Sequence, residues 1–257
     1  MIDHIANWLK EYCTESRQRG FVIGISGGID SSVTSALCAR TGFPVLCVEM
    51  PIHQAASQVA RGQEHITWLK ERSPLVSNTV VDLTTTFEAM VATLPTNANL
   101  EGVELARANT RARLRMTTLY YLAGLYGYLV AGTGNKVEDF GVGFFTKYGD
   151  GGVDLSPIAD LTKTEVYELA KALGVVQSIQ EAAPTDGLFG DSRTDADQIG
   201  ATYPELEWAM AYREKKGPGS GLSPRQMEIL AIFDRRHAAN LHKMVPIPVC
   251  TLPEEYR

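Results

Sequence analysis

The 257-residue sequence has no long apolar run and few cysteines. No stretch approaches the roughly 18 consecutive apolar residues that a membrane-spanning helix needs. The polar, periodic segment MIDHIANWLKEYC at the start does not have the pattern of a signal peptide. The four cysteines are scattered and form no CxxC pair, so we expect small buried side chains rather than a zinc or redox site. These absences predict a cytoplasmic protein with no membrane partner.

Positive charge is also scarce. Lysine and arginine number 24 against 30 aspartates and glutamates, which gives a net charge of −6. A protein that coats duplex nucleic acid needs a basic surface, so we expect no nucleic-acid partner. The 44% of hydrophobic and 21% of charged residues are those of an ordinary globular protein, and the length allows a sizeable core.

Short apolar runs alternate with helical patterns in the first half of the chain. The runs, which show little polar–apolar alternation, are residues 21–25, 45–49, 79–83 and 128–131. The helical patterns cover residues 2–12, 31–40, 54–71, 84–94 and 101–126. Continuous apolar strands are typical of a parallel sheet that is covered on both faces. We therefore predict an α/β fold with three layers, in which a Rossmann-like parallel sheet is flanked by helices.

The pattern changes after residue 131. Residues 132–157 are rich in glycine and predict a loop with short structure, and three more helices are expected at residues 162–173, 204–215 and 223–241. Residues 183–203 show no helical periodicity, and a stretch of that length is typical of a functional lid. With no internal repeat and no clear boundary, we expect a single domain over residues 1–257.

A glycine-rich turn follows the first predicted strand. The segment FVIGISGGIDSSV, residues 21–33, leads from a buried strand through Ser26, Gly27 and Gly28 into a helix. Adjacent glycines let the backbone approach a ligand, and the N–H groups at the start of a helix favour phosphate. Neither the Walker A lysine nor a GxGxxG pattern is present. Asp30 would repel phosphate unless a cation lies between them, so it is a candidate Mg²⁺ ligand; the alternative is an aspartate that only caps the helix.

The motif SGGIDS resembles the pyrophosphate loop of the adenine-nucleotide alpha hydrolases, which cleave ATP between the α and β phosphates. Later segments select one family among them. The block GFFTKYGDGGVDLSP at residues 143–157 is similar to the signature of NAD synthetases. Further matches to that family, in family order, are GT at 132–133, LTK at 161–163, APTD at 183–186, NTRARLRM at 109–116 and HK at 242–243.

The resemblance to NAD synthetases implies an ATP-dependent amidation. The nicotinate carboxylate of deamido-NAD attacks the α-phosphorus of ATP, and an acyl-adenylate and pyrophosphate form. Ammonia then displaces AMP and gives NAD, with Mg²⁺ as cofactor and ATP as co-substrate. Glutamine-dependent members carry an additional amidase domain about as large as this chain. Because the synthetase blocks begin near residue 21, we expect no such domain here and free ammonia as the nitrogen source.

The resemblance also assigns roles at the matching positions. The residues expected to bind ATP are Gly24, Ile25, Ser26, Gly27, Gly28, Ile29, Asp30, Ser31, Thr133, Lys163 and Thr185. Those expected to bind deamido-NAD are Arg113, Lys147, Asp154, His242 and Lys243. Asp30 and Glu138 are expected to hold the metal, and Asp150, Lys163 and Thr185 to take part in catalysis. A lysine in the first turn of a helix opposes the helix dipole, which favours a bound anion near Lys163.

Two assignments stay open. NAD synthetases often have one residue fewer between 137 and 143, so either Glu138 or Asp139 reaches the metal, and counting from Thr133 selects Glu138. Either Asp150 or Asp154 takes a proton from ammonium, or each only hydrogen-bonds the substrate.

Other functions and the oligomeric state are also considered. A pyrophosphate-loop ligase that acts on another nucleotide or on tRNA is disfavoured by the acidic charge. A non-catalytic nucleotide-binding subunit is disfavoured because Asp30, Glu138 and Lys163 are all present. The helix at 101–126 has apolar residues on more than one face, namely Leu105, Leu119, Tyr120, Tyr121, Leu122 and Leu125. Such a helix is buried on most sides, and the resemblance places it at a homodimer interface.

Overall fold

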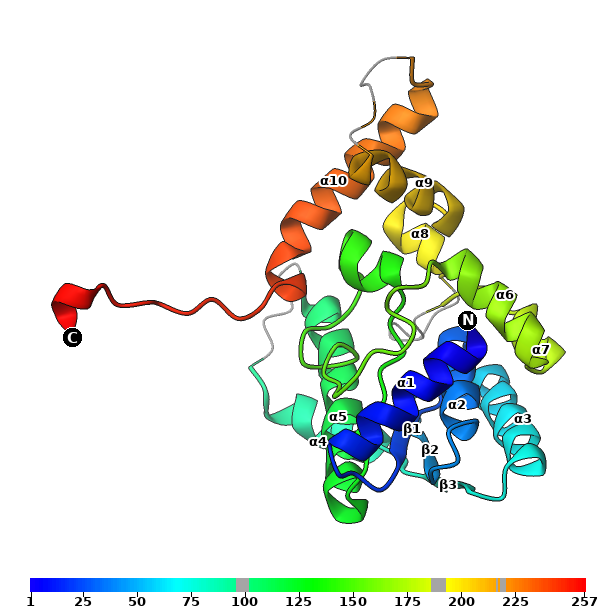
Figure 1. Cartoon of the computed structure of the whole chain (residues 1–257). Coiled ribbons are helices and arrows are strands. Elements are labelled where there is room, and N and C mark those ends of the chain that lie inside the picture. The colour runs from blue at the N-terminus through cyan, green and yellow to red at the C-terminus, as the bar shows by residue number, and fades with distance from the viewer. Residues whose placement is uncertain (96–101, 186–192, 216, 218–220) are drawn as a thin grey trace.

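A parallel sheet of four strands is the framework of the fold (Figure 1). The structure is a computed structural model that describes residues 1–257 except 96–101, 186–192, 216 and 218–220. In spatial order the strands are β3 (Val76–Val80), β2 (Val45–Glu49), β1 (Phe21–Gly24) and β4 (Leu129–Val130). All three neighbouring pairs are parallel, which confirms the predicted sheet.

Helices cover both sides of this sheet. Successive strand residues face opposite sides, so Phe21 and Ile23 belong to one apolar core and Val22 to another. The first core is closed by α1 (Ile2–Glu15), α2 (Ile29–Ala39), α3 (Ala56–Arg72), α6 (Lys163–Leu173) and α7 (Gln177–Gln180). The second is closed by α4 (Thr84–Thr93) and α5 (Val103–Tyr126). The three-layer α/β prediction is therefore confirmed.

Strand β3 departs from its prediction in position and burial. It was expected at residues 79–83 but runs from Val76 to Val80, paired with β2 from Val45 to Glu49. Only Val76 is buried, because β3 is the edge strand and its sequence VSNTV is mostly polar. The expectation that every strand is covered on both faces is wrong for β3. The apolar residues Val81 and Leu83, which suggested the later position, lie just beyond the strand.

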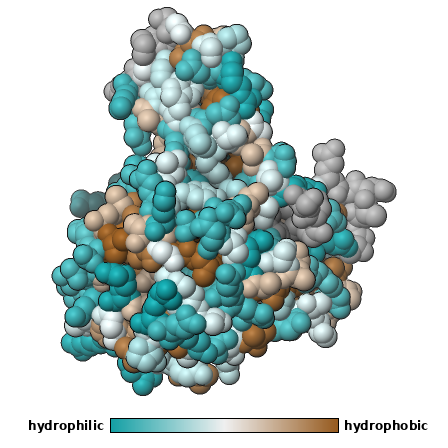
Figure 2. Space-filling view, turned by 90° about the vertical axis from the view of Figure 1, so that its right-hand side faces the viewer, coloured by the Kyte–Doolittle hydropathy of each residue, from teal (hydrophilic) through white to brown (hydrophobic). Residues whose placement is uncertain are grey.

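A third apolar core lies outside the sheet. It is built from the π-helix η1 (Val137–Val142), α8 (Asp195–Ile199), α9 (Tyr203–Glu214) and α10 (Pro224–Met244). Leu206, Ile229 and Phe233 are among its buried residues. These helices form a narrower lobe above the broader body that holds the sheet (Figures 1 and 2). After α10 the chain extends away from the body and ends in the short helix η2 (Glu254–Tyr256).

Most predicted helices are confirmed to within a few residues, and α7 was not predicted. The prediction that residues 183–203 have no helical structure is wrong in part, because this stretch contains α8. A capping box of Thr194 and Asp197 starts the helix, and Gly200 caps its end. The middle of the expected lid, residues 186–192, and most of the glycine-rich turn at 215–221 lie outside the described residues. No helix in the described part of the chain combines the length and apolar character needed to cross a bilayer.

The π-helix η1 lies in the segment that was expected to be loop. It occupies residues 137–142, where the resemblance to NAD synthetases predicted an additional residue. A π-helix is wider than an α-helix because its backbone hydrogen bonds join residues five apart. Such turns accommodate an extra residue, and the N–H of Gly143 accordingly bonds the carbonyl of Glu138. This geometry sets the direction of the Glu138 side chain.

Candidate active site

The loop after β1 is shaped for close contact with a ligand. It runs from Gly24 to Gly28, where α2 begins. Gly27 has a φ of +76°, and a Cβ there would overlap the carbonyl oxygen of Gln58 in α3. The hydroxyls of Ser31 and Ser32 donate to the carbonyl of Gly28 at 3.1 and 2.9 Å. Glycine is therefore required at position 27, and hydrogen bonds from the first turn of α2 fix the end of the loop.

This loop opens into a cavity of about 300 Å³. The cavity walls come from the loop, α3, α5, the segment after β4 and the start of α6. All the expected ATP, metal and catalytic residues line it: residues 24–31, Thr133, Glu138, Asp150, Lys163 and Thr185. Residues that are far apart in the sequence thus meet at the carboxyl ends of the strands, where ligands bind in open parallel sheets.

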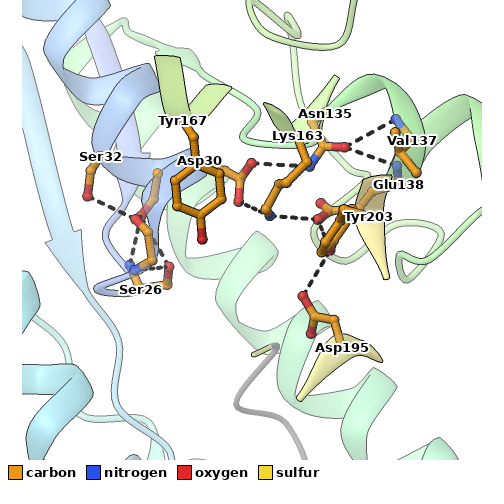
Figure 3. A network of polar contacts seen from close by, with 12 residues as sticks. Ser26, Asp30, Ser32, Asn135, Val137, Glu138, Lys163, Tyr167, Asp195 and Tyr203 are labelled. Atoms are coloured by element: carbon orange, nitrogen blue, oxygen red, sulfur yellow. Dashed lines mark hydrogen bonds and ion pairs between the residues drawn. The ribbon is translucent and has the colours of Figure 1, made fainter. Parts of the chain in front are cut away.

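A buried cluster of three charged groups lies at one end of the cavity (Figure 3). The Lys163 ammonium is 2.6 Å from Asp30 Oδ2 and 2.9 Å from Glu138 Oε1, and only 4% of the lysine side chain is exposed. Burial lowers the pKa of Lys163, but the charges and hydrogen bonds of the two carboxylates raise it well above its usual range. Lys163 is therefore a cation, and its partners in this structure are the carboxylates of Asp30 and Glu138.

Lys163 is placed by the start of α6. Thr162 caps the helix in a capping box with Glu165, in which the Thr162 N–H donates to Glu165 Oε2 at 2.8 Å. Lys163 is then the first residue of the helix. This confirms the predicted helix start, and the local cap directs the ammonium into the cavity.

Two neighbours of the cluster were not anticipated. Asn135 donates to Asp30 Oδ1 at 3.1 Å and accepts the N–H groups of Val137 and Glu138 at 3.1 and 3.2 Å. The Tyr203 hydroxyl donates to Glu138 Oε1 and lies 2.9 Å from Asp195 Oδ2. An asparagine that precedes a helix is a recognisable cap, so Asn135 had a local signal. Tyr203 had none, because its partners come from other elements.

The structure separates the two acids that the sequence left open. Glu138 shares the Lys163 ammonium with Asp30. The Asp139 carboxylate lies instead against Gly134, where any Cβ would overlap it. Burial and the nearby charges of Glu138, Asp150 and Asp30 raise the pKa of Asp139 to about 8. Of the two acids, Glu138 is thus the one that faces the same cation as Asp30.

Asp150 belongs to the glycine-rich loop on the other side of the cavity. Its Oδ1 accepts the N–H of Thr146 at 2.9 Å, and Thr146 in turn donates to Asn109 of α5 at 2.6 Å. The residue has exposed surface, but its carboxyl turns back onto the loop. Withdrawal of the carboxyl from water, together with the charge of Glu138, raises its pKa to about 6, against the lowering effect of the Thr146 N–H.

Thr185 lies in the segment after α7 and lines the cavity. Its hydroxyl accepts a hydrogen bond from Gln58 Nε2 of α3 at 2.9 Å. Arg61 of the same helix donates to the carbonyl of Gly27 at 3.3 Å. Helix α3 therefore joins the first loop to the segment of Thr185, and no local pattern predicted this role for Gln58 or Arg61.

Four of the residues expected to bind deamido-NAD form a group of their own. Arg113 donates to the carbonyl of Lys147 at 3.3 Å, and Lys147 Nζ donates to the carbonyl of His242 at 2.7 Å. Lys243 Nζ donates to the carbonyls of Phe145 at 2.6 Å and of Gly143. In the described structure they surround the loop at 143–150 but are absent from the cavity wall.

Asp154 is separate from that group. Its carboxylate accepts the N–H of Val130 at 2.8 Å and the hydroxyl of Tyr120 at 3.0 Å. Asp154 thus provides a hydrogen-bond acceptor for the backbone of β4. The resemblance assigns Asp154 to deamido-NAD binding together with the other four residues, and in this structure it lies apart from them beside β4.

Comparison with known proteins identifies the family. A family model described as NAD synthase matches residues 1–245. The chain belongs to the NAD synthase family. An NH3-dependent NAD(+) synthetase of Syntrophomonas wolfei is 35% identical over an alignment of 259 positions that covers 100% of this chain and 98% of the relative. One of Carboxydothermus hydrogenoformans is 38% identical over 211 residues, which are 80% and 82% of the two chains. The solved structure of an NMN synthetase from Francisella tularensis has a TM-score of 0.83 and 31% identity, and covers 98% of this chain and 97% of the other.

Proposed function

We propose that this NAD synthase family member makes NAD from deamido-NAD, ATP and ammonia, and releases AMP and pyrophosphate. The observation that carries the proposal is the cavity in which the glycine loop faces the buried Asp30–Lys163–Glu138 cluster. The loop and the start of α2 supply N–H groups for phosphate oxygens, and Lys163 and Thr185 supply further donors. The nicotinate carboxylate attacks the α-phosphorus, pyrophosphate leaves, and ammonia then displaces AMP from the acyl carbon.

The residues present fit a magnesium ion. Asp30 and Glu138 already face one cation, the Lys163 ammonium, at 2.6 and 2.9 Å. Among the described residues no group of three or more metal-ligating side chains gathers. Magnesium commonly uses only one or two carboxylates and takes its other ligands from phosphates and water. We infer that Asp30 and Glu138 hold Mg²⁺, which when bound would act as a Lewis acid on the phosphates.

The acid that receives a proton from the incoming nitrogen is proposed to be Asp150. It lines the cavity, and its pKa of about 6 leaves it ionised near neutral pH. A general base works best when its pKa lies near the working pH. Asp154 is less suited, because both of its oxygens already accept hydrogen bonds beside β4.

Deamido-NAD is proposed to bind at the group formed by Arg113, Lys147, His242 and Lys243. Two lysines and an arginine there provide positive charge for the pyrophosphate of the dinucleotide. Because this group adjoins the loop that carries Asp150, a substrate bound there extends its nicotinate end toward the cavity. The proposal rests on these four residues and leaves Asp154 aside.

A homodimer is proposed from the surface of α5. Leu119 and Leu122 pack into the core of the sheet. Leu105, Tyr121 and Leu125 are exposed by 56, 70 and 58%. A helix with apolar residues on its outer side is typical of an interface with a second copy.

A second candidate substrate is nicotinate mononucleotide. The similarity to the Francisella tularensis NMN synthetase, with a TM-score of 0.83, favours it. The same two steps on the mononucleotide would give NMN, so the cluster of Asp30, Glu138 and Lys163 serves either substrate.

The test is a product assay with both substrates. The purified chain is given Mg²⁺, ATP and ammonium with either deamido-NAD or nicotinate mononucleotide, and NAD, NMN, AMP and pyrophosphate are quantified by mass spectrometry. We expect NAD, AMP and pyrophosphate in equal amounts from deamido-NAD, and no NAD when glutamine replaces ammonium. Preferential formation of NMN would support the second candidate. Formation of neither product, or release of ADP, would overturn both.

A further inference from the structure

Each of the two proposed metal ligands has one oxygen held by a neutral side chain. Asn135 fixes Asp30 through Oδ1, at 3.1 Å. Tyr203 fixes Glu138 through Oε1, the same oxygen that faces Lys163. Within the described residues no hydrogen bond or ion pair is formed by Glu138 Oε2, and Glu138 lines the cavity. Tyr203 therefore orients the carboxylate while leaving one of its oxygens for a metal.

Tyr203 also contacts Lys163 and Asp195 (Figure 3). Its ring lies under the Lys163 ammonium, 4.6 Å from the ring centre. Its hydroxyl is 2.9 Å from Asp195, the first residue of α8. The residue is only 8% exposed and begins α9, whose start is fixed by a capping box of Thr202 and Glu205. One buried side chain thus joins the outer lobe to both the lysine and the glutamate.

We propose that Tyr203 is a positioning residue of the adenylation step, which fixes the Glu138 carboxylate for metal binding. The inference rests on the proposed function. Hydrogen-bond partners of metal ligands orient them, and their loss typically costs 10–100-fold in metal affinity or activity. The freedom of a glutamate side chain, with three rotatable bonds, makes such a partner more important here than for the shorter Asp30. Without the hydroxyl, Glu138 is held on one oxygen by Lys163 alone.

The experiment measures metal binding directly. Mn²⁺ binding is followed by electron paramagnetic resonance in the full chain with α,β-methylene-ATP, which is not cleaved between the α and β phosphates. Tyr203→Phe removes the hydroxyl and keeps the ring. We expect Mn²⁺ affinity to fall roughly 10–100-fold, and the Mg²⁺ concentration for half-maximal pyrophosphate release to rise by a similar factor. At saturating Mg²⁺ kcat should largely recover.

A double-variant cycle shows whether Tyr203 acts through Glu138. In Glu138→Gln the ligand is already lost, so adding Tyr203→Phe should weaken Mn²⁺ binding no further. Tyr128→Phe is the control, because Tyr128 packs on Tyr126 at 5.6 Å between ring centres and belongs to the second core. All titrations are run at 10 °C, with circular dichroism as the check on folding.

The outcomes separate the two proposals. Wild-type Mn²⁺ affinity in Tyr203→Phe, or losses that add in the double variant, would overturn the role of Tyr203. A role in packing alone would lower the melting temperature and leave Mn²⁺ affinity unchanged. If the wild type formed neither NAD nor NMN, the proposed function would fail instead, and the Mn²⁺ comparison would still report on Tyr203.

Discussion

At the scale of single residues, Lys163 decides the electrostatics of the cavity. Asp30, Glu138 and Lys163 are all largely buried, with exposed side-chain fractions of 18, 16 and 4%. Two buried carboxylates so close together repel each other unless a cation lies between them. The ammonium fills that place in this structure. We propose that a bound metal ion would take over this role beside ATP, so that Lys163 and the metal compete for the same two carboxylates.

This competition gives a prediction for Lys163→Met. Without metal the variant should unfold more easily by about 3–5 kcal/mol, because two buried carboxylates lose their cation. Mn²⁺ without ATP should restore more stability to the variant than to the wild type, because the ion takes the vacated place. Urea unfolding with and without Mn²⁺ measures both effects. Lys136→Met is the control, since Lys136 pairs only with exposed acids and should change stability by less than about 1 kcal/mol. An equal effect of Mn²⁺ on variant and wild type would refute the competition.

The pKa of Asp150 gives a prediction about pH. The carboxyl can accept a proton only when ionised, and its pKa is raised to about 6. With total ammonium fixed, the rate of NAD formation should rise with pH up to about 6 and then level off. If free ammonia were the form that binds, the rate would continue to rise about tenfold per pH unit above that point. Asp150→Asn should show this second dependence, while its first-turnover burst of pyrophosphate, which precedes the ammonia step, stays as in the wild type. A continued rise in the wild type would remove Asp150 from this role.

At the scale of elements, the first loop depends on its contact with α3. Gly27 has a positive φ and lies directly against the carbonyl of Gln58, and Gln58 also donates to Thr185. Arg61 of the same helix donates to the Gly27 carbonyl. Helix α3 therefore determines both the shape of the loop and its distance from the Thr185 segment. A change at this contact should affect ATP binding more than it affects the sheet.

Gly27→Ala tests the contact. A side chain at positive φ costs roughly 1–2 kcal/mol, and the overlap with Gln58 adds to that cost by pushing the loop from α3. We expect a stability loss above 2 kcal/mol and a clearly raised KM for ATP. Gly42→Ala is the matched control, because Gly42 also has a positive φ, of +81°, but an added Cβ there has nothing within 4 Å. It should show only the backbone cost and a normal KM. Equal behaviour of the two variants would mean that the contact with α3 is unimportant.

At the scale of the whole molecule, local patterns predicted the framework and missed the contacts between segments. Apolar runs and helix caps such as Thr162 depend on neighbouring residues, so the parallel sheet and most helices were predicted correctly. The position of β3 was missed because edge strands do not need continuous apolar residues. Tyr203 and Glu138 are 65 residues apart, and their meeting depends on the packing of η1 against α9. The expected ATP and metal residues in the cavity were found through motif resemblance. Gln58 and Tyr203 became evident only in the folded chain, and Asn135 was missed although its position before a helix is a local signal.

The outer side of α5 provides the last prediction, at the scale of the assembly. Stable dimers bury about 1,200–2,000 Å² in total, and exposed apolar side chains such as Tyr121 and Leu125 supply the interior of such an interface. By sedimentation at micromolar concentration the wild type should be a dimer.

Leu125→Asp should be a folded monomer, because the residue is 58% exposed within the chain and the charge would be buried only between copies. Met227→Asp changes an apolar residue that is 54% exposed on α10 and should remain a dimer. If deamido-NAD affinity falls along with the dimer, the Arg113 and Lys147 group depends on the second copy; a wild type that is active as a monomer would exclude the dimer.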